Sequence, residues 1–114
     1  MKLSETVVAL EALAQESRLG IFRLLVVSGP SGLPAGKIAE RMKLPAPTLS
    51  FHLAQLKHAD LIACERQGRS LIYSANFKQM SEVVQFLTEN CCGSEFVCAP
   101  VCTPSQLKRK EKTR

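Results

Sequence analysis

The segment from Leu49 to Ala75, LSFHLAQLKHADLIACERQGRSLIYSA, decides the fold because it joins a helical pattern directly to a hairpin pattern. Its leucines at Leu49, Leu53 and Leu56 recur at helical spacing and predict a helix from about Pro47 to Ala59 with one apolar stripe. Two extended runs follow, LIACER and SLIYSA, and the turn between them contains Gln-Gly-Arg. This arrangement is typical of a β-hairpin.

Four more helices are expected around this segment. Serine N-caps indicate a first helix over Ser4–Gln15 and a second over Ser17–Ser28. The third helix is expected to have Pro34 near its first turn and to stop before the PAP link, and the fifth runs over about Lys78–Asn90. The chain is therefore predicted to be mainly α-helical, with five helices and a small β-hairpin.

The third and fourth helices, joined by a short link, form a helix-turn-helix pattern. The fourth helix buries leucines and presents short polar side chains, and no acid occurs between Pro45 and His58 that would repel phosphate. The hairpin turn adds two arginines beside this helix, which suits phosphate or minor-groove contact. The candidate DNA contacts are Thr48, Ser50, His52, Gln55, Lys57, Arg66 and Arg69.

Alternatives apply to several of these side chains. His52 suits helix packing or capping nearly as well as a contact with phosphate or a base. His58 is expected on the ordinary surface. Tyr73 is expected in the core with its hydroxyl in water, and the alternative for this residue is a contact with DNA. Cys64 is expected to be a small buried hydrophobic residue.

The motifs SFHLAQL, ADLI and RQGRSLIY, together with LAQESRLGIFRLL over Leu13–Leu25, resemble the ArsR/SmtB transcriptional repressors across roughly residues 5–90. The resemblance implies a winged helix-turn-helix homodimer paired through its first and fifth helices. It also implies a palindromic operator that is released when a metal or metalloid binds. Asp60 stands where that family usually has Gly, and Asp tolerates the left-handed conformation that this place requires.

The stretch TENCCGSEFVC, Thr88–Cys98, begins a cluster of thiols. Two inducer sites known in the family have no counterpart here, because the helix before the recognition helix has no Cys and the last helix has no His. Three thiolates suit trivalent arsenic or antimony, and Gly93 would let the adjacent cysteines converge. The predicted ligands are Cys91, Cys92 and Cys98, with Cys102 a spare fourth thiol or a substitute third.

The expected function is an operator-binding repressor, and two alternatives remain open at this point. One is a redox-sensing repressor with vicinal thiols, and the other is a metal- or metalloid-sequestering protein. Structural zinc and incidental tail cysteines are further readings of the cluster. No acid pair, nucleophile–base motif or phosphate loop suggests an enzyme, and apart from the metalloid inducer no cofactor is expected.

The expected organisation is a DNA-binding and dimerisation domain over 1–90 and a cysteine-containing tail over 91–114. The tail ends in KRKEKTR, which carries most of the net charge of +5 and is expected to be a solvated, disordered end. No apolar run approaches a membrane span of ~18 residues, and the first residues lack a signal-peptide pattern. We therefore expect a cytoplasmic protein. The operator sequence and the choice among arsenite, antimonite and a methylated arsenical do not follow from the sequence.

Overall fold

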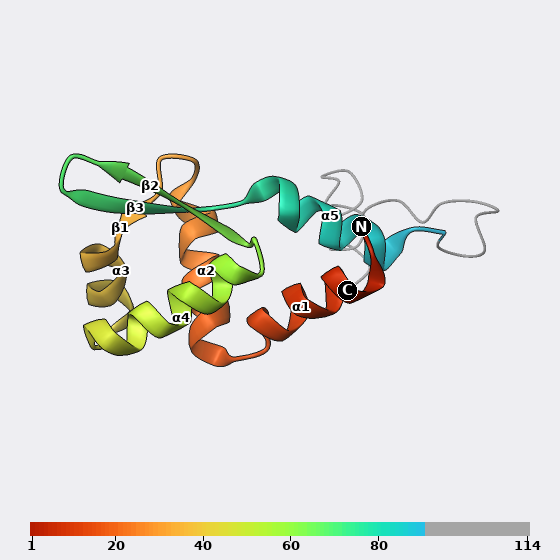
Figure 1. Ribbon diagram of the computed structural model, residues 1–114, viewed down its shortest axis with the longest axis horizontal. Coiled ribbons are helices and arrows are strands. Elements are labelled where there is room, and N and C mark those ends of the chain that lie inside the picture. The colour runs from red at the N-terminus through yellow and green to blue at the C-terminus, as the bar shows by residue number, and fades with distance from the viewer. Residues whose placement is uncertain (91–114) are drawn as a thin grey trace, which may run out of the picture.

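The structure is a computed structural model that describes residues 1–90, and these residues form five helices and one three-stranded antiparallel sheet (Figure 1). This is the winged helix-turn-helix fold, as predicted. The elements are α1 (Leu3–Leu13), α2 (Glu16–Ser28), β1 (Leu33–Pro34), α3 (Ala35–Met42), α4 (Ala46–His58), β2 (Ile62–Gln67), β3 (Ser70–Ala75) and α5 (Phe77–Thr88).

The first two helices start earlier than predicted because neither is capped by a serine. At α1, the Glu5 carboxylate accepts a hydrogen bond of 3.0 Å from the backbone N–H of Lys2. At α2, the side-chain oxygen of Gln15 accepts one of 2.9 Å from the backbone N–H of Arg18. Longer polar side chains thus satisfy the free N–H groups that each helix start leaves without an intrahelical partner.

The predicted hairpin is present, and a third strand joins it. β3 lies in the centre of the sheet, paired with β2 on one side and with the two-residue strand β1 on the other. Gly32, with a φ of 72°, precedes β1, and a Cβ there would collide with the backbone carbonyl of Tyr73. Glycine therefore allows the chain to come close enough to β3 to pair with it.

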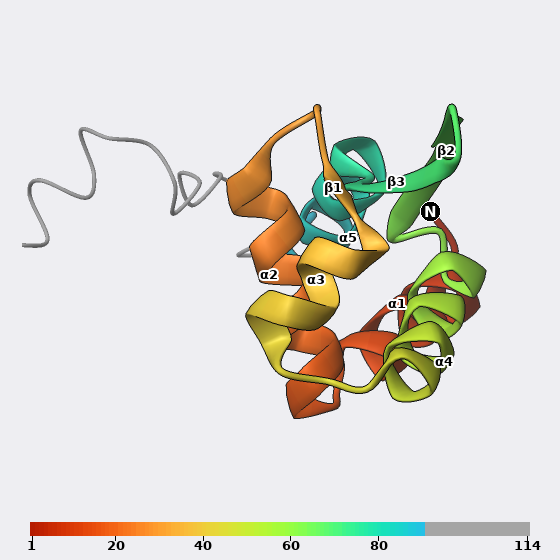
Figure 2. The same ribbon diagram turned by 90° about the vertical axis from the view of Figure 1, so that its left-hand side faces the viewer.

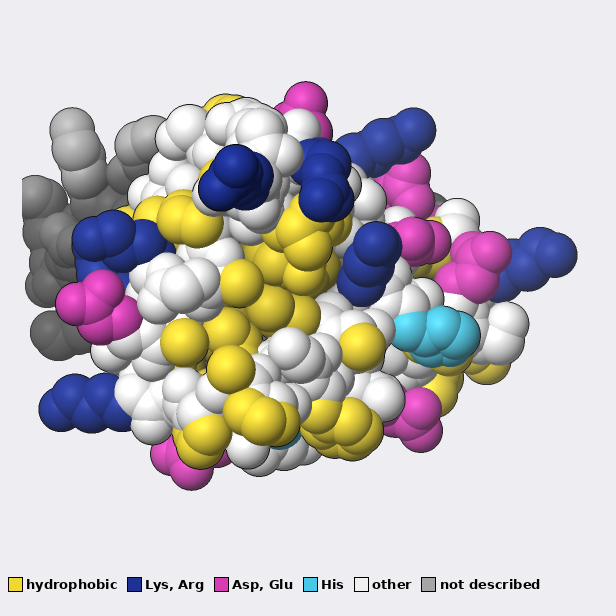
Figure 3. Space-filling view, turned by 60° about the vertical axis from the view of Figure 1, so that its left-hand side comes forward, with side chains coloured by type: hydrophobic (Ala, Val, Ile, Leu, Met, Phe, Trp, Pro, Cys, Tyr) yellow, Lys and Arg dark blue, Asp and Glu magenta, His cyan; other side chains and the backbone are white. Residues whose placement is uncertain are grey.

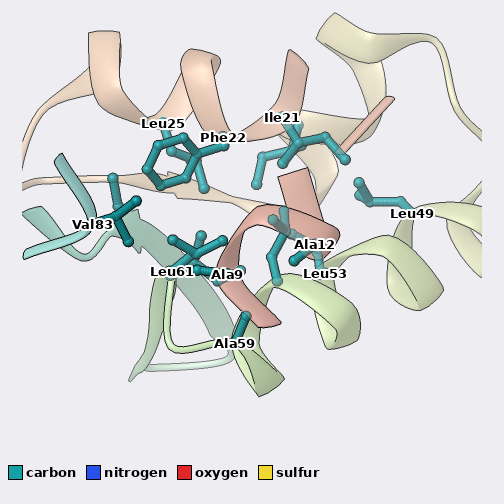
Figure 4. Packing of buried hydrophobic residues seen from close by; sticks show 14 residues of the cluster. Ala9, Ala12, Ile21, Phe22, Leu25, Leu49, Leu53, Ala59, Leu61 and Val83 are labelled. Carbon is teal, nitrogen blue, oxygen red and sulfur yellow. The ribbon is translucent and has the colours of Figure 1, made fainter. Parts of the chain in front are cut away.

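One cluster of buried apolar side chains holds the helices to the base of the sheet (Figure 4). α2 contributes Ile21 and Leu25, which are fully buried, and α4 contributes Leu56. Leu61, between α4 and β2, and Val83 of α5 are also part of this cluster. Because α4 meets the core through its leucine stripe, its opposite side remains free to contact a partner.

The elements are divided between two ends of the molecule. The wing and α3 lie toward one end with the start of α4, whereas α1 and α5 lie together at the other (Figures 1 and 2). Within residues 1–90 no helix is long and apolar enough to cross a membrane.

Candidate nucleic-acid interface

Helix α4 is oriented by its three leucines, Leu49, Leu53 and Leu56, which are at most 3% exposed. The turn that precedes it is sharp because Lys43 ends α3 in the left-handed conformation, with a φ of 58°. Pro45 then caps α4 in an extended conformation that suits proline. These local features present the N-terminal half of α4 on the surface beside α3.

Six of the seven predicted DNA contacts have exposed side chains. Four of them lie on α4 and two lie at the tip of the wing, where Gly68 makes the turn with a φ of 62°. They are Thr48, Ser50, Gln55 and Lys57 on α4, and Arg66 and Arg69 at the wing. Whether each of them touches DNA remains a prediction.

His52 is the seventh, and it is buried, with 8% of its surface exposed. Its Nδ1 lies 3.5 Å from Nη1 of Arg18, and Nε of the same arginine donates a 2.8 Å hydrogen bond to the carbonyl of Ala12. This geometry favours the packing role for His52. Arg18 thereby links the end of α1 and the start of α2 to the recognition helix.

Two hollows flank α4. One, of about 240 Å³, lies between α4 and the wing and is lined by Ser50, Leu53, Ala54, Lys57 and Tyr73. The other, of about 260 Å³, lies on the α1 side of the helix and includes Gln55, Arg18 and His58. The ridge of α4 therefore stands out between two depressions, a shape that can enter a groove.

The charges around this ridge are mostly positive. Exposed lysines and arginines lie around it on α3, α4 and the wing. The exposed acids on α3 and β2 are fewer, namely Glu40 and Glu65. Figure 3, which looks toward the end that carries the wing and α3, shows a central apolar area with Lys and Arg side chains around it and acids mainly at its edges. The exposed cations are Lys37 and Arg41 of α3, Lys43 at its C-terminal end, Lys57 of α4, and Arg66 and Arg69 of the wing.

Phe51 is an exposed aromatic side chain of α4 that is not among the predicted DNA contacts. Its side chain is 58% exposed, and its ring makes an edge contact with the His52 ring, with centroids 5.8 Å apart and planes at 61°. The helical period places position 51 away from the leucine stripe, so the signal was available from spacing alone.

Tyr73 and Cys64 face each other across the wing at partner positions of β3 and β2. Both are half-buried, so Cys64 is less buried than expected. Burial raises the pKa of the Tyr73 hydroxyl above its ordinary value of 10.0, and the neighbouring Cys64 thiol raises it further. Tyr73 is therefore neutral at physiological pH and packs at the edge of the hollow beside α4.

The predicted metalloid ligands Cys91, Cys92, Cys98 and Cys102, and the hinge Gly93, lie outside the described residues. Among residues 1–90, no three His, Cys, Asp or Glu side chains are grouped so that they could hold a metal ion.

Comparison with known proteins agrees with this geometry. Residues 13–65 match a family model described as a helix-turn-helix domain. The chain is 27% identical over 89 residues to the transcriptional activator HlyU of Vibrio cholerae. The aligned residues make up 78% of this chain and 80% of that protein.

Solved structures show the same fold. An ArsR-like transcriptional regulator from Rhodococcus superposes with a TM-score of 0.66 at 24% identity, covering 74% of this chain and 76% of that one. A homodimeric winged helix-turn-helix DNA-binding domain from Mycobacterium bovis superposes with a TM-score of 0.61 at 24% identity, covering 77% of this chain and 82% of that one. The chain therefore has a winged helix-turn-helix fold with a helix-turn-helix domain over residues 13–65, and it is similar to transcriptional regulators such as HlyU.

Proposed function

We propose that this protein binds operator DNA as a homodimer and regulates transcription. The observation that carries the proposal is the surface of α4, an acid-free ridge beside an arginine-tipped wing. In a helix-turn-helix protein such a ridge enters the major groove, and the wing contacts the flanking backbone.

A second copy of the chain is the partner that best fits the apolar face of α1 and α5. The exposed leucines and valines at this end recur at helical spacing, and such a face favours association. The homodimeric Mycobacterium bovis domain has the same fold. The residues are Leu3, Val7 and Leu10 of α1, and Val84 and Leu87 of α5.

Pairing through this face leaves α4 and the wing of each protomer available at the opposite end. Two recognition helices would then meet half-sites about one helical turn apart, and the operator should be palindromic. Transcription would be repressed where the dimer overlaps a promoter.

The inducer in this proposal is trivalent arsenic or antimony, bound by the thiolates of Cys91, Cys92 and Cys98. Cys102 is a spare fourth ligand or a substitute for one of these three. Support comes from the sequence, since these are soft ligands that suit a thiophilic ion. Cys91 follows Thr88, the last residue of α5, by three positions, so a bound ion would act next to the proposed dimer face. A change in dimer geometry would alter the spacing of the two α4 helices.

The test is a titration of arsenite into a complex of the full chain with a duplex selected from a randomised library, followed by fluorescence anisotropy. We expect operator affinity to fall by roughly 5- to 150-fold, the usual range for allosteric coupling. The double variant Cys91→Ser/Cys92→Ser should bind DNA like the parent and no longer respond, whereas Cys64→Ser should respond fully.

Release of DNA by arsenite from the double variant would rule out the proposed ligands. Release by peroxide but not by arsenite would instead favour a redox-sensing regulator. Absence of any salt-dependent duplex binding would overturn the DNA-binding proposal itself.

A further inference from the structure

Phe51 is a large aromatic side chain exposed on the part of α4 that the proposed function aims at DNA. A single exposed apolar residue needs no explanation on an ordinary surface. Here its position, its neighbours and its contact with the His52 ring together distinguish it.

Its position follows from the helical period of about 100° per residue. Relative to the buried Leu49 and Leu53, residue 51 projects toward solvent together with Pro47 and Ala54, which are exposed as well. Ser50 beside it is also small. Small neighbours allow a helix to come close to another surface, and the phenyl ring is the largest exposed side chain among them.

The ring also has a fixed partner. It makes its edge contact with the His52 ring, whose centroid lies 5.8 Å away, and His52 is itself buried. Arg18 lies 3.5 Å from the His52 ring and is fastened to the Ala12 carbonyl. An edge contact with a buried ring restrains the phenyl ring in part, which reduces the side-chain entropy lost when the ring meets a partner.

We propose that Phe51 determines operator specificity by packing against the C5-methyl group of a thymine in each half-site. A phenyl ring has no hydrogen-bonding group, and the thymine methyl is the apolar feature that base edges display in the major groove. The inference rests on the proposed DNA-binding function and deepens it. It predicts a required thymine near the centre of the contact made by α4.

The experiment replaces single thymines of the selected duplex by deoxyuridine, which removes only the methyl group and keeps base pairing. The full-length parent should lose about fourfold in affinity for one sensitive methyl, and roughly ten- to twentyfold when the symmetric position is replaced too. Phe51→Ala should bind the thymine and uracil duplexes equally well at that position, with an unchanged dependence on salt concentration.

Phe51→Leu serves as a second variant, because its apolar side chain should keep part of the discrimination. Val27→Ala is the matched control, since Val27 is an apolar residue of α2 that is 78% exposed. It should show the parent's response to every uracil. Circular dichroism of all the variants checks that they are folded.

The outcomes separate the two proposals. If Phe51→Ala retains the parent's sensitivity at every thymine, or if no thymine methyl matters to the parent, the specificity role is wrong while DNA binding stands. If the parent selects no duplex and shows no salt-dependent binding, the proposed function itself fails.

Discussion

At the scale of single residues, the space around the backbone and its φ angle decide whether a position in this fold requires glycine. Gly32 has a positive φ, and a Cβ there would meet the Tyr73 carbonyl, whereas Gly36 in α3 has no heavy atom within 4 Å of such a Cβ. The two glycines flank β1 and have opposite requirements.

We predict that Gly32→Ala lowers the free energy of unfolding by about 2 kcal/mol or more, from left-handed strain plus the backbone clash. Gly36→Ala is the control and should raise it by up to about 1 kcal/mol through helix propensity. Thermal unfolding at matched protein concentration checks both changes. Equal effects of the two variants would mean that the approach of β1 to β3 contributes little.

Residue-level prediction from sequence worked where spacing alone decides orientation. The leucines of α4 are buried as expected because helical spacing fixes which side they occupy. His52 lies next to that stripe, and its ring contacts Arg18, which is 34 positions away in the sequence. Periodicity carries no information about such a distant partner, so the sequence left the role of His52 open.

At the scale of elements, the wing is a hairpin whose tip carries charge. Arg66 and Arg69 are exposed on either side of Gly68. Each arginine is expected to neutralise one phosphate in the proposed complex.

Removing both arginines should therefore flatten the salt dependence of operator binding. For a dimer, Arg66→Ala/Arg69→Ala eliminates four phosphate contacts, and the slope of log affinity against log salt should fall by roughly 3 to 4 units. Arg23→Ala, on the exposed side of α2, should leave the slope unchanged. The slopes are obtained from operator affinities measured between roughly 50 and 200 mM salt. An unaltered slope in the double variant would show that the wing does not contact DNA.

Elements were predicted well when their pattern is local. Alternation predicts the hairpin, and leucine spacing predicts α4. In the structure, the ends of α4 and of both hairpin strands lie within one residue of the expected positions. β1 was missed because a strand of two residues that ends in proline has no periodicity. Its pairing depends on the close approach at Gly32, which is a tertiary contact. The cysteine-containing segment stays a prediction.

At the scale of the whole molecule, the apolar face of α1 and α5 should determine the oligomeric state. Leu10 and Leu87 are 40% and 59% exposed in the isolated chain. A charged group at either position would have to be buried in the proposed dimer, which is costly.

We expect Leu10→Lys/Leu87→Lys to be monomeric by light scattering and to lose roughly 100-fold or more in operator affinity, because a monomer engages a single half-site. Val27→Lys, which places the same charge on α2, should remain dimeric and bind normally. A dimeric double variant would place the interface elsewhere.

The small strand β1 has a consequence for how copies of the chain can associate. Sheets grow when an edge offers a row of free N–H and C=O groups to another strand. β1 offers only Leu33 and Pro34, and a proline has no N–H to donate, while the opposite edge, β2, carries Glu65 and Arg66. Strand addition, and with it fibrous aggregation, is thus discouraged at both edges, which is consistent with the helical face as the proposed contact between two chains.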